Sequence, residues 1–208
     1  MEACLDAVRE LDVQALEAAV GRAIITFGPL VACNRVIVPL MSELGRSWEH
    51  GRLAIVHEHM ASAVIRTVLG SIASGRPRHN GTTVIIVATP AGASHELGAL
   101  MGVVTAVSTG WNPTYLGPSL PAGEIASAAR ARGARAVALS VTFPPADPAV
   151  ADELERLRGG IPDTPIVVGG EAAASYAATL DSIHAMHHAT MHELRETLDR
   201  LAREDHSG

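Results

Sequence analysis

Regular alternation of apolar strands with helices, from residue 83 to the C-terminal end, constrains the fold of this chain more than any other feature. Short apolar runs predict strands over residues 83–89, 113–116, 136–141, 165–168 and, more weakly, 182–186. Helices are predicted over 95–109 and 122–132, from Pro148 to Arg158 after an Asp147 cap, after Glu171, and from a Thr190-x-x-Glu193 capping box. Such alternation is typical of an α/β protein. Five repeats favour a flavodoxin-like (Rossmann-like) parallel sheet with strand order 2-1-3-4-5.

The residues before this region carry helical patterns and no strand signal. Four helices are predicted, with Asp12 as the cap of the second and with the stripe Val56, Met60, Val64 and Val68 on the fourth. Ser71–Thr82 contains Gly, Pro and several polar residues, as linkers do. We therefore predict a four-helix bundle domain over residues 1–75 and a sheet domain over residues 82–208.

Composition narrows the class of protein. The chain has 208 residues, 48% of them hydrophobic, and a formal net charge of −6. No apolar run is long enough to span a bilayer and no export signal opens the chain, so we expect no membrane association and a cytoplasmic location. Arginine is dispersed along the chain, which argues against direct nucleic-acid binding. Cys4 and Cys33 lack partners at zinc-finger spacing.

The corner Gly92–Gly98 joins the first predicted strand to the helix that follows and carries His95. In an open α/β sheet such a corner lies at the carboxyl end of a strand, where ligands bind. Gly98 and Gly102 would let a flat group or a neighbouring backbone approach closely. The simpler alternative is a histidine that bonds a nearby backbone group at a helix start.

A second candidate surface lies on the fourth predicted helix. Ile55, Glu58, His59 and Ser62 share one face at helical spacing, and that face is too polar for a hydrophobic core. A bundle edge that is partly open to water is the alternative explanation. The histidines His184, His187, His188 and His192 are interpreted as a solvated helix start, and we assign no metal there.

Three loops of the predicted sheet domain resemble the signature loops of cobalamin-binding domains. His95-x-x-Gly98 matches the family's Asp-x-His-x-x-Gly, Ser140-Val141-Thr142 matches its Ser-x-Thr, and Gly169-Gly170 matches its Gly-Gly. The resemblance implies that His95 is the lower ligand of the cobalt in place of the cofactor's benzimidazole. It also implies that the freed nucleotide tail enters the sheet domain beside Ser140, Thr142 and the two glycines.

The bundle resembles the cap of light-sensing transcriptional regulators of the CarH type. Trp48, nine residues and then Glu58-His59 match the family's Trp-x9-Glu-His. The resemblance implies adenosylcobalamin, with Trp48 and Ile55 on the cofactor side of the cap. An indole can shield a cobalt–carbon bond, and a carboxylate can hold ribose hydroxyls. His59 would bond a corrin amide or brace Glu58.

Two positions depart from this family. Ala93 stands where an acidic residue normally orients the histidine, and Glu49 stands where the regulators have a cobalt-capturing histidine, with His50 one residue out of register. The DNA-reading helix-turn-helix that precedes these domains in the regulators is missing, so we expect a sensor without its own output or an excised fragment.

Three functions remain open. The favoured one is a cobalamin-binding light or ligand sensor that changes its oligomeric state or its contacts with a separate output protein. The second is a corrinoid carrier that serves methyltransferases, and the third is a pocket for another tetrapyrrole such as a bilin. No hydrolase elbow, phosphate loop or metalloprotease helix occurs in the sequence, so we do not expect an enzyme.

Overall fold

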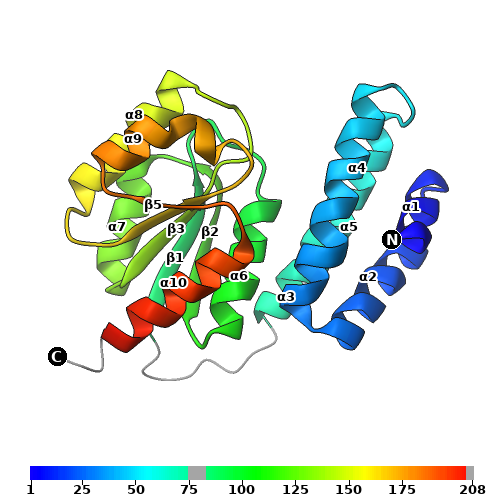
Figure 1. Cartoon of the computed structure of the whole chain (residues 1–208), viewed down its shortest axis with the longest axis horizontal. Coiled ribbons are helices and arrows are strands. Elements are labelled where there is room, and N and C mark those ends of the chain that lie inside the picture. The colour runs from blue at the N-terminus through cyan, green and yellow to red at the C-terminus, as the bar shows by residue number, and fades with distance from the viewer. Residues whose placement is uncertain (75–82, 205–208) are drawn as a thin grey trace. The chain divides into compact units, whose positions relative to one another are not determined.

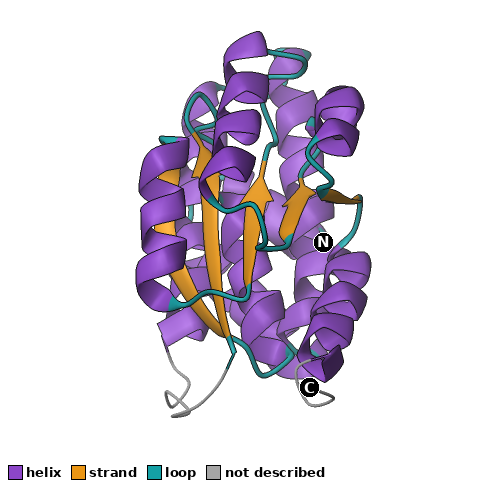
Figure 2. Ribbon diagram, turned by 90° about the vertical axis from the view of Figure 1, so that its left-hand side faces the viewer, coloured by secondary structure: helices purple, strands orange, loops and turns teal. Residues whose placement is uncertain are grey.

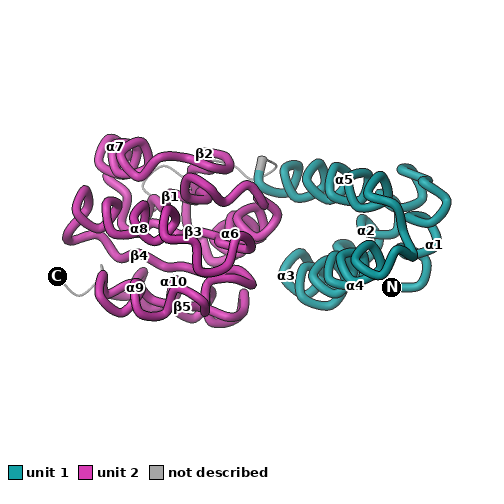
Figure 3. The backbone as a smooth tube through the Cα atoms, turned by 90° about the horizontal axis from the view of Figure 1, so that it is seen from above, with its two compact units in different colours: residues 1–76 teal, residues 77–208 magenta. Residues whose placement is uncertain are grey.

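The structure, a computed structural model, describes residues 1–74 and 83–204 and divides into two compact units, Met1–Arg76 and Pro77–Gly208 (Figure 3). The described residues of the first unit are helical or lie in short turns (Figure 1). Its elements are α1 (Glu2–Arg9), α2 (Val13–Phe27), α3 (Pro29–Ala32), a π-helical turn (Cys33–Ile37), α4 (Val38–Glu49) and α5 (Ile55–Ser74). Because α3, the π turn and α4 follow one another without a break, they form the third of four helical segments, as predicted.

The bundle packs around large aliphatic side chains that are fully buried, among them Leu16, Ile37, Leu40, Leu44, Ile65 and Leu69. Asp12 caps α2, since its carboxylate accepts a 2.9 Å hydrogen bond from the Ala15 amide. The π turn lies just before Pro39, which has no N–H to donate to the carbonyl four residues earlier, so one wider turn absorbs the mismatch.

Two details of α5 differ from the sequence prediction. Of the predicted stripe, Val64 and Val68 are buried as expected, whereas Val56 is 49% exposed. A strict four-residue spacing advances by about 40° per step around an α-helix, so this stripe reaches the core only in its second half. The neighbouring stripe of Ala61, Ile65 and Leu69 is fully buried. The helix also continues to Ser74, so residues 71–74 of the predicted linker are helical. The remaining linker residues, 75–82, lie outside the described part of the chain.

The second unit is a five-stranded parallel sheet with order β2-β1-β3-β4-β5, which confirms the predicted flavodoxin-like α/β fold. Helices lie on both sides of the strands (Figure 2). The strands are β1 (Val84–Pro90), β2 (Asn112–Leu120), β3 (Ala136–Ser140), β4 (Ile166–Gly169) and β5 (Met186–His188). The helices are α6 (Leu97–Ser108), α7 (Ala122–Arg132), α8 (Pro148–Gly160), α9 (Ala177–Ser182) and α10 (Met191–Glu204), with a 3-10 turn at Ala173–Tyr176.

Alternation along the strands separates the two faces of the sheet. One face packs Ile86, Val137, Leu139 and Val168 in a single core with α7, α8 and α9. The residues between them, such as Val87, Ala138 and Val167, therefore point to the opposite face. On that face α6 packs against α10 (Figure 1).

The end of the chain contains the main error of the sequence prediction. The fifth strand is Met186–His188, not 182–186, so His187 and His188 are strand residues and His192 alone lies at the start of α10. The capping box forms with one shift. Thr190 accepts from the Glu193 amide at 3.2 Å, but the Glu193 carboxylate accepts from the Ala189 amide at 2.8 Å. As predicted, Leu194, Leu198 and Leu201 are buried.

Candidate functional site

The corner between β1 and α6 is held to the end of β2 by two hydroxyl groups. Thr89 Oγ1 donates to the Ala93 carbonyl and accepts a 2.7 Å hydrogen bond from the Ser119 amide. Ser119 Oγ in turn accepts from the Gly92 amide at 3.3 Å. The backbone before His95 is therefore positioned by Thr89 and Ser119. Ala93 is fully buried in the apolar core. Its methyl group cannot orient the His95 ring as a carboxylate would.

His95 projects from this corner as an exposed side chain. Its ring packs against that of Phe143 in a T-shaped arrangement, with 5.9 Å between the ring centroids and an interplanar angle of 70°. Phe143 follows Thr142 in the loop after β3 and is 57% exposed. Thus the loops after β1 and β3 lie side by side, as the strand order predicts for a switch point between these strands.

Gly98, at the start of α6, lies close to Ser140 at the end of β3. A Cβ atom at this position would collide with Ser140 Oγ and would lie 3.4 Å from Ser140 Cβ and 3.6 Å from Thr142 Oγ1. Ser140 is only 5% exposed, and its hydroxyl has no hydrogen-bond partner. The missing side chain at Gly98 therefore creates the space in which the Ser140 hydroxyl lies.

Gly169 ends β4, Gly170 follows it, and both are tightly enclosed by backbone. Gly170 has φ of +109°, and a Cβ there would lie 2.5 Å from the Val141 carbonyl oxygen. A Cβ on Gly169 would lie 3.2 Å from the His188 carbonyl oxygen. We expected these glycines to leave room for a buried tail. At Gly170, the space of the absent side chain is filled by the neighbouring loop.

Sequence reasoning did not single out His188, which lies in line with two of the predicted site residues. Ser140 pairs with Gly169 across β3 and β4, and Gly169 pairs with His188 across β4 and β5, so the three residues form one row at the carboxyl end of the sheet. His188 Nε2 is buried without a partner, and burial lowers the pKa of the imidazole below its usual value of 6.5. The only sequence signal was its place in a histidine-rich segment, which fixed neither its strand nor its register.

The bundle face predicted from the sequence is partly open. Trp48, at the end of α4, is 49% exposed, and Ile55, at the start of α5, is 44% exposed. Glu58 is bonded on both carboxylate oxygens, to His59 Nδ1 at 2.7 Å and to Ser62 Oγ at 2.6 Å. His59 and Ser62 therefore fix the orientation of the Glu58 carboxylate.

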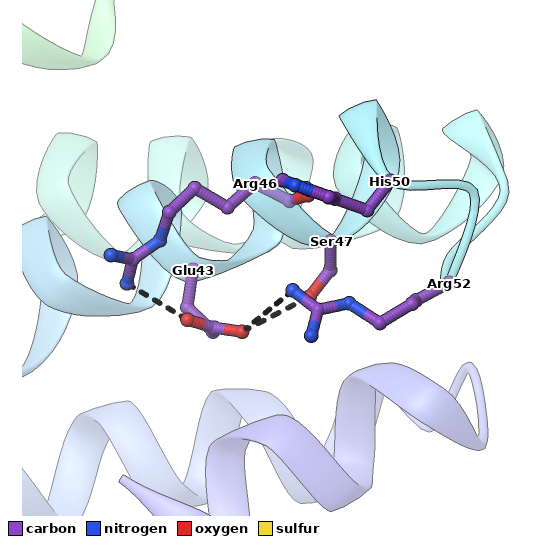
Figure 4. A network of polar contacts seen from close by, with 5 residues as sticks. All are labelled: Glu43, Arg46, Ser47, His50 and Arg52. Atoms are coloured by element: carbon purple, nitrogen blue, oxygen red, sulfur yellow. Dashed lines mark hydrogen bonds and ion pairs between the residues drawn. The ribbon is translucent and has the colours of Figure 1, made fainter.

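A polar network holds the end of α4, next to Trp48 (Figure 4). Glu43 accepts from Arg46 at 2.8 Å and from Ser47 at 3.1 Å, and Arg52 lies 3.8 Å away from it. The Ser47 hydrogen bond, with Arg46 and Arg52, holds the pKa of the Glu43 carboxyl below its usual value. Arg52 also donates its amide to the Ser47 carbonyl, which ties the following turn to the helix.

Glu49 and His50 lie exposed after Trp48. His50 Nδ1 donates to the Arg46 carbonyl at 2.6 Å (Figure 4), so only its Nε2 is free of that bond. His57 Nδ1 likewise bonds the Ala54 carbonyl at 3.0 Å. Cys4 and Cys33 are buried, and burial raises the pKa of the Cys33 thiol to about 11, so neither belongs to this face.

Two sequence profiles of B12 binding domains match the chain, one over residues 1–72 and the other over residues 83–202. The HTH-type transcriptional repressor CarH of Myxococcus xanthus is 29% identical over 202 residues, which is 97% of this chain and 66% of that protein. The HTH-type transcriptional repressor CarA of the same organism is 30% identical over 162 residues, which is 78% of this chain and 54% of CarA. The chain thus spans less than two thirds of either relative.

Solved structures share the fold at low sequence identity. A monomethylamine corrinoid protein of Methanosarcina barkeri superposes with a TM-score of 0.74 at 13% identity, over 95% of this chain and 96% of its own. A cobalamin-binding protein of Desulfitobacterium hafniense gives a TM-score of 0.50 at 17% identity, over 96% and 97%. Among the helices described in residues 1–74 and 83–204, none is long and apolar enough to cross a membrane.

Proposed function

The chain belongs to the B12 binding domain family, and we propose from this premise that it is a sensor module that binds adenosylcobalamin and responds to light. Cobalamin binding follows from the family. The adenosyl form, the light response and the individual residues are our proposal. Similarity to CarH across 97% of this chain is the observation that carries it, because it includes both the bundle and the sheet.

The sheet unit fits the nucleotide tail of the cofactor. The Ser140 hydroxyl is buried without a partner, and an unpaired buried polar group costs about 1–3 kcal/mol unless a ligand satisfies it. Gly98 has no side chain and so leaves room for that hydroxyl. Thr142 Oγ1 lies nearby, 3.6 Å from where a Cβ on Gly98 would be. Ser140 and Thr142 would bind the tail, and the backbones of Gly98, Gly169 and Gly170 would lie beside it.

His95 would be the lower ligand of cobalt. It is exposed at the end of a corner that Thr89 and Ser119 hold in place, so its imidazole can meet a corrin ring without a change in the backbone. No carboxylate orients the His95 ring, because position 93 is Ala. The Phe143 ring packs against it and restricts its orientation instead. The imidazole is a common ligand for transition metals of this kind.

The bundle would cover the upper side of the cofactor. Trp48 and Ile55 offer exposed apolar surface, which favours contact with a large flat ligand over water. Glu58, oriented by His59 and Ser62, would hold the ribose hydroxyls of the adenosyl group. His59 would therefore act as the brace of Glu58.

Adenosylcobalamin supplies a cobalt–carbon bond that light can break. The residues of this chain would sense the loss of the adenosyl group through Trp48 and Glu58, and the response would be a change in oligomeric state or in contacts with a separate output protein. The two relatives are HTH-type repressors, but the chain spans only 66% and 54% of them. DNA binding is therefore not part of this proposal.

Absorption spectra test the function. We expect the purified protein to bind adenosylcobalamin with the benzimidazole displaced, and to change both spectrum and gel-filtration volume on illumination. His95→Ala should keep its folding, because the side chain is exposed, but lose the histidine-ligated spectrum.

An unchanged cofactor spectrum in His95→Ala would remove His95 from the site. Equal affinity for methylcobalamin and adenosylcobalamin, without a light-dependent change in size, would support the corrinoid carrier. Binding of a bilin but of no corrinoid would support the third function.

A further inference from the structure

Two buried side-chain atoms in residues 1–74 and 83–204 have no hydrogen-bond partner: Ser140 Oγ and His188 Nε2. They lie on different strands and are 48 positions apart in the sequence. Each unpaired group in a protein interior costs about 1–3 kcal/mol. Two in one region of the sheet indicate that something outside the protein satisfies them.

Strand register places both residues in one row. Ser140, Gly169 and His188 are consecutive partners across β3, β4 and β5. Neighbouring strands are about 4.8 Å apart, so the Ser140 and His188 Cα atoms are roughly 10 Å apart. Gly169, which has no side chain, lies between them. The row thus has a polar group at each end and no side chain in the middle.

Both side chains point to the same face of the sheet. Ile86, Leu139 and Val168 pack on the α7–α9 side, so Ser140, one residue after Leu139, and Gly169, one residue after Val168, point to the side of α6 and α10. His188 is the register partner of Gly169 and takes the same side. Gly98 of α6, which contacts Ser140, and Glu193 of α10, which lies near His188, agree with this assignment.

The surroundings of His188 favour a neutral imidazole. Its side chain is 13% exposed, and Nδ1 lies 4.0 Å from Glu193 Oε2, which is too long for a hydrogen bond. Burial lowers the pKa of His188, and the charges of His187 and Arg200 lower it further, whereas Glu193 and a hydrogen bond with the His187 backbone oppose this shift. At neutral pH, Nε2 therefore belongs to an uncharged ring that can bond a polar ligand group without bringing in a charge.

We propose that His188 is a further cofactor-binding residue, and that its Nε2 bonds a polar group of the cofactor's nucleotide tail at the opposite end of the row from Ser140. This inference rests on the cobalamin binding proposed above. A nucleotide tail carries hydrogen-bonding groups on its phosphate, ribose and base, and so can satisfy two protein groups at once. Gly169 has no side chain that could come between the tail and these two groups.

A comparison of two corrinoids tests the contact. Cobalamin carries the tail, and cobinamide has the same ring without it. We expect His188→Phe, which fills the same space without a nitrogen, to weaken cobalamin binding about tenfold and to leave cobinamide binding unchanged. The tenfold loss corresponds to about 1.4 kcal/mol. His188→Gln should restore affinity because its amide reaches toward the position of Nε2, whereas the shorter His188→Asn should not.

His187→Phe is the matched control, since this exposed neighbour on β5 points to the other face. Circular dichroism and thermal unfolding confirm that each variant is folded. Wild-type affinity for cobalamin in His188→Phe, or equal losses for both corrinoids, would overturn the inference. Failure of the wild type to bind either corrinoid would instead overturn the proposed function.

A third corrinoid, with adenine in place of dimethylbenzimidazole, identifies the tail group. A loss in His188→Phe that is equal for both bases supports a contact to ribose or phosphate. A loss that depends on the base supports a contact to the base. In both cases His188 binds the tail.

Discussion

The sheet unit forms its candidate site by close approach of backbone, whereas the bundle unit forms its candidate face from side chains on helix surfaces. Gly98 and Gly170 are needed because Ser140 and the Val141 backbone occupy the space of a side chain. In the bundle, Glu58 is held by its own helix neighbours, and Trp48 and Ile55 are about half exposed. A side chain added at one of these glycines should therefore disturb the fold, while a substitution on the bundle face should alter ligand preference alone.

The largest effect should come from Gly170→Ala, compared with Gly51→Ala in the bundle. Both glycines have positive φ, +109° and +67°, but a Cβ on Gly51 would meet nothing within 4 Å. The strained backbone alone costs about 1–2 kcal/mol, and the collision with Val141 adds about 1–3 kcal/mol. We expect losses of about 2–5 kcal/mol for Gly170→Ala and about 1–2 kcal/mol for Gly51→Ala.

The two tryptophans separate these measurements. Trp111 is buried in the sheet unit, and Trp48 lies in the bundle. Urea unfolding is followed by tryptophan fluorescence. Trp48→Phe leaves Trp111 as the probe of the sheet unit, and Trp111→Phe leaves Trp48 as the probe of the bundle. Similar losses for both glycine variants would contradict the proposed difference between the units.

A smaller loss is expected for Gly98→Ala, because the colliding atom is a side-chain hydroxyl. Ser140 can rotate, so the cost should be about 1–2 kcal/mol. In the double variant with Ser140→Ala, the nearest remaining contact is the 3.4 Å approach of Cβ to Cβ, so most stability should return. Cobalamin affinity should stay low in both. A double variant that is no more stable than Gly98→Ala would show that the strain lies elsewhere.

Much of this architecture was predictable from the sequence. The strand order and the pairing of the His95 and Ser140 loops follow from alternating elements, because parallel strands with helical crossovers permit few topologies. Asp12 and Asp147 mark helix starts that the structure confirms. These features depend on local pattern and on chain connectivity.

The rest depends on three-dimensional register. β5 was misplaced because a three-residue edge strand, Met186-His187-His188, has no apolar alternation to mark it. His188 therefore could not be paired with Gly169 and Ser140 in advance. The crowding of Gly170 by Val141 is likewise a contact between two loops, and a Gly-Gly pair alone does not reveal which atoms approach it.

Acid should weaken the sheet unit through His188. Burial lowers its folded pKa below 6.5, the value for an unperturbed histidine, so the unfolded chain binds the proton more readily. Its contribution is fully present above pH 6.5 and is lost as pH falls from there through the folded pKa. Glu193 acts in a lower window, since the Ala189 amide lowers its pKa below 4.5.

Unfolding free energies between pH 8 and pH 5, read from Trp111 fluorescence, measure this effect. The decrease should be smaller in His188→Gln than in the wild type. His187→Gln serves as the control. His187 is an exposed histidine next to His188, and its charge acts on the His188 ring. Identical pH profiles for wild type and His188→Gln would show that His188 is not buried as a neutral ring.

The smallest effect on stability and the sharpest test of the bundle face should come from Glu49→His. Glu49 is exposed at the end of α4, so its replacement should change the free energy of unfolding by less than about 0.5 kcal/mol. A carboxylate is a harder and weaker partner for cobalt than an imidazole. We therefore expect illuminated wild type to keep a single histidine ligand. Illuminated Glu49→His should gain a second histidine ligand and should elute at a volume that differs from that of the illuminated wild type. Glu49→Gln removes the charge without adding an imidazole and should behave as wild type.

His50 is one residue out of register and its Nδ1 bonds the Arg46 carbonyl, so it should not substitute for a histidine at position 49. A bis-histidine spectrum in the illuminated wild type that disappears in His50→Ala would show that the end of α4 rearranges, and that the bundle face is less fixed than its hydrogen bonds indicate.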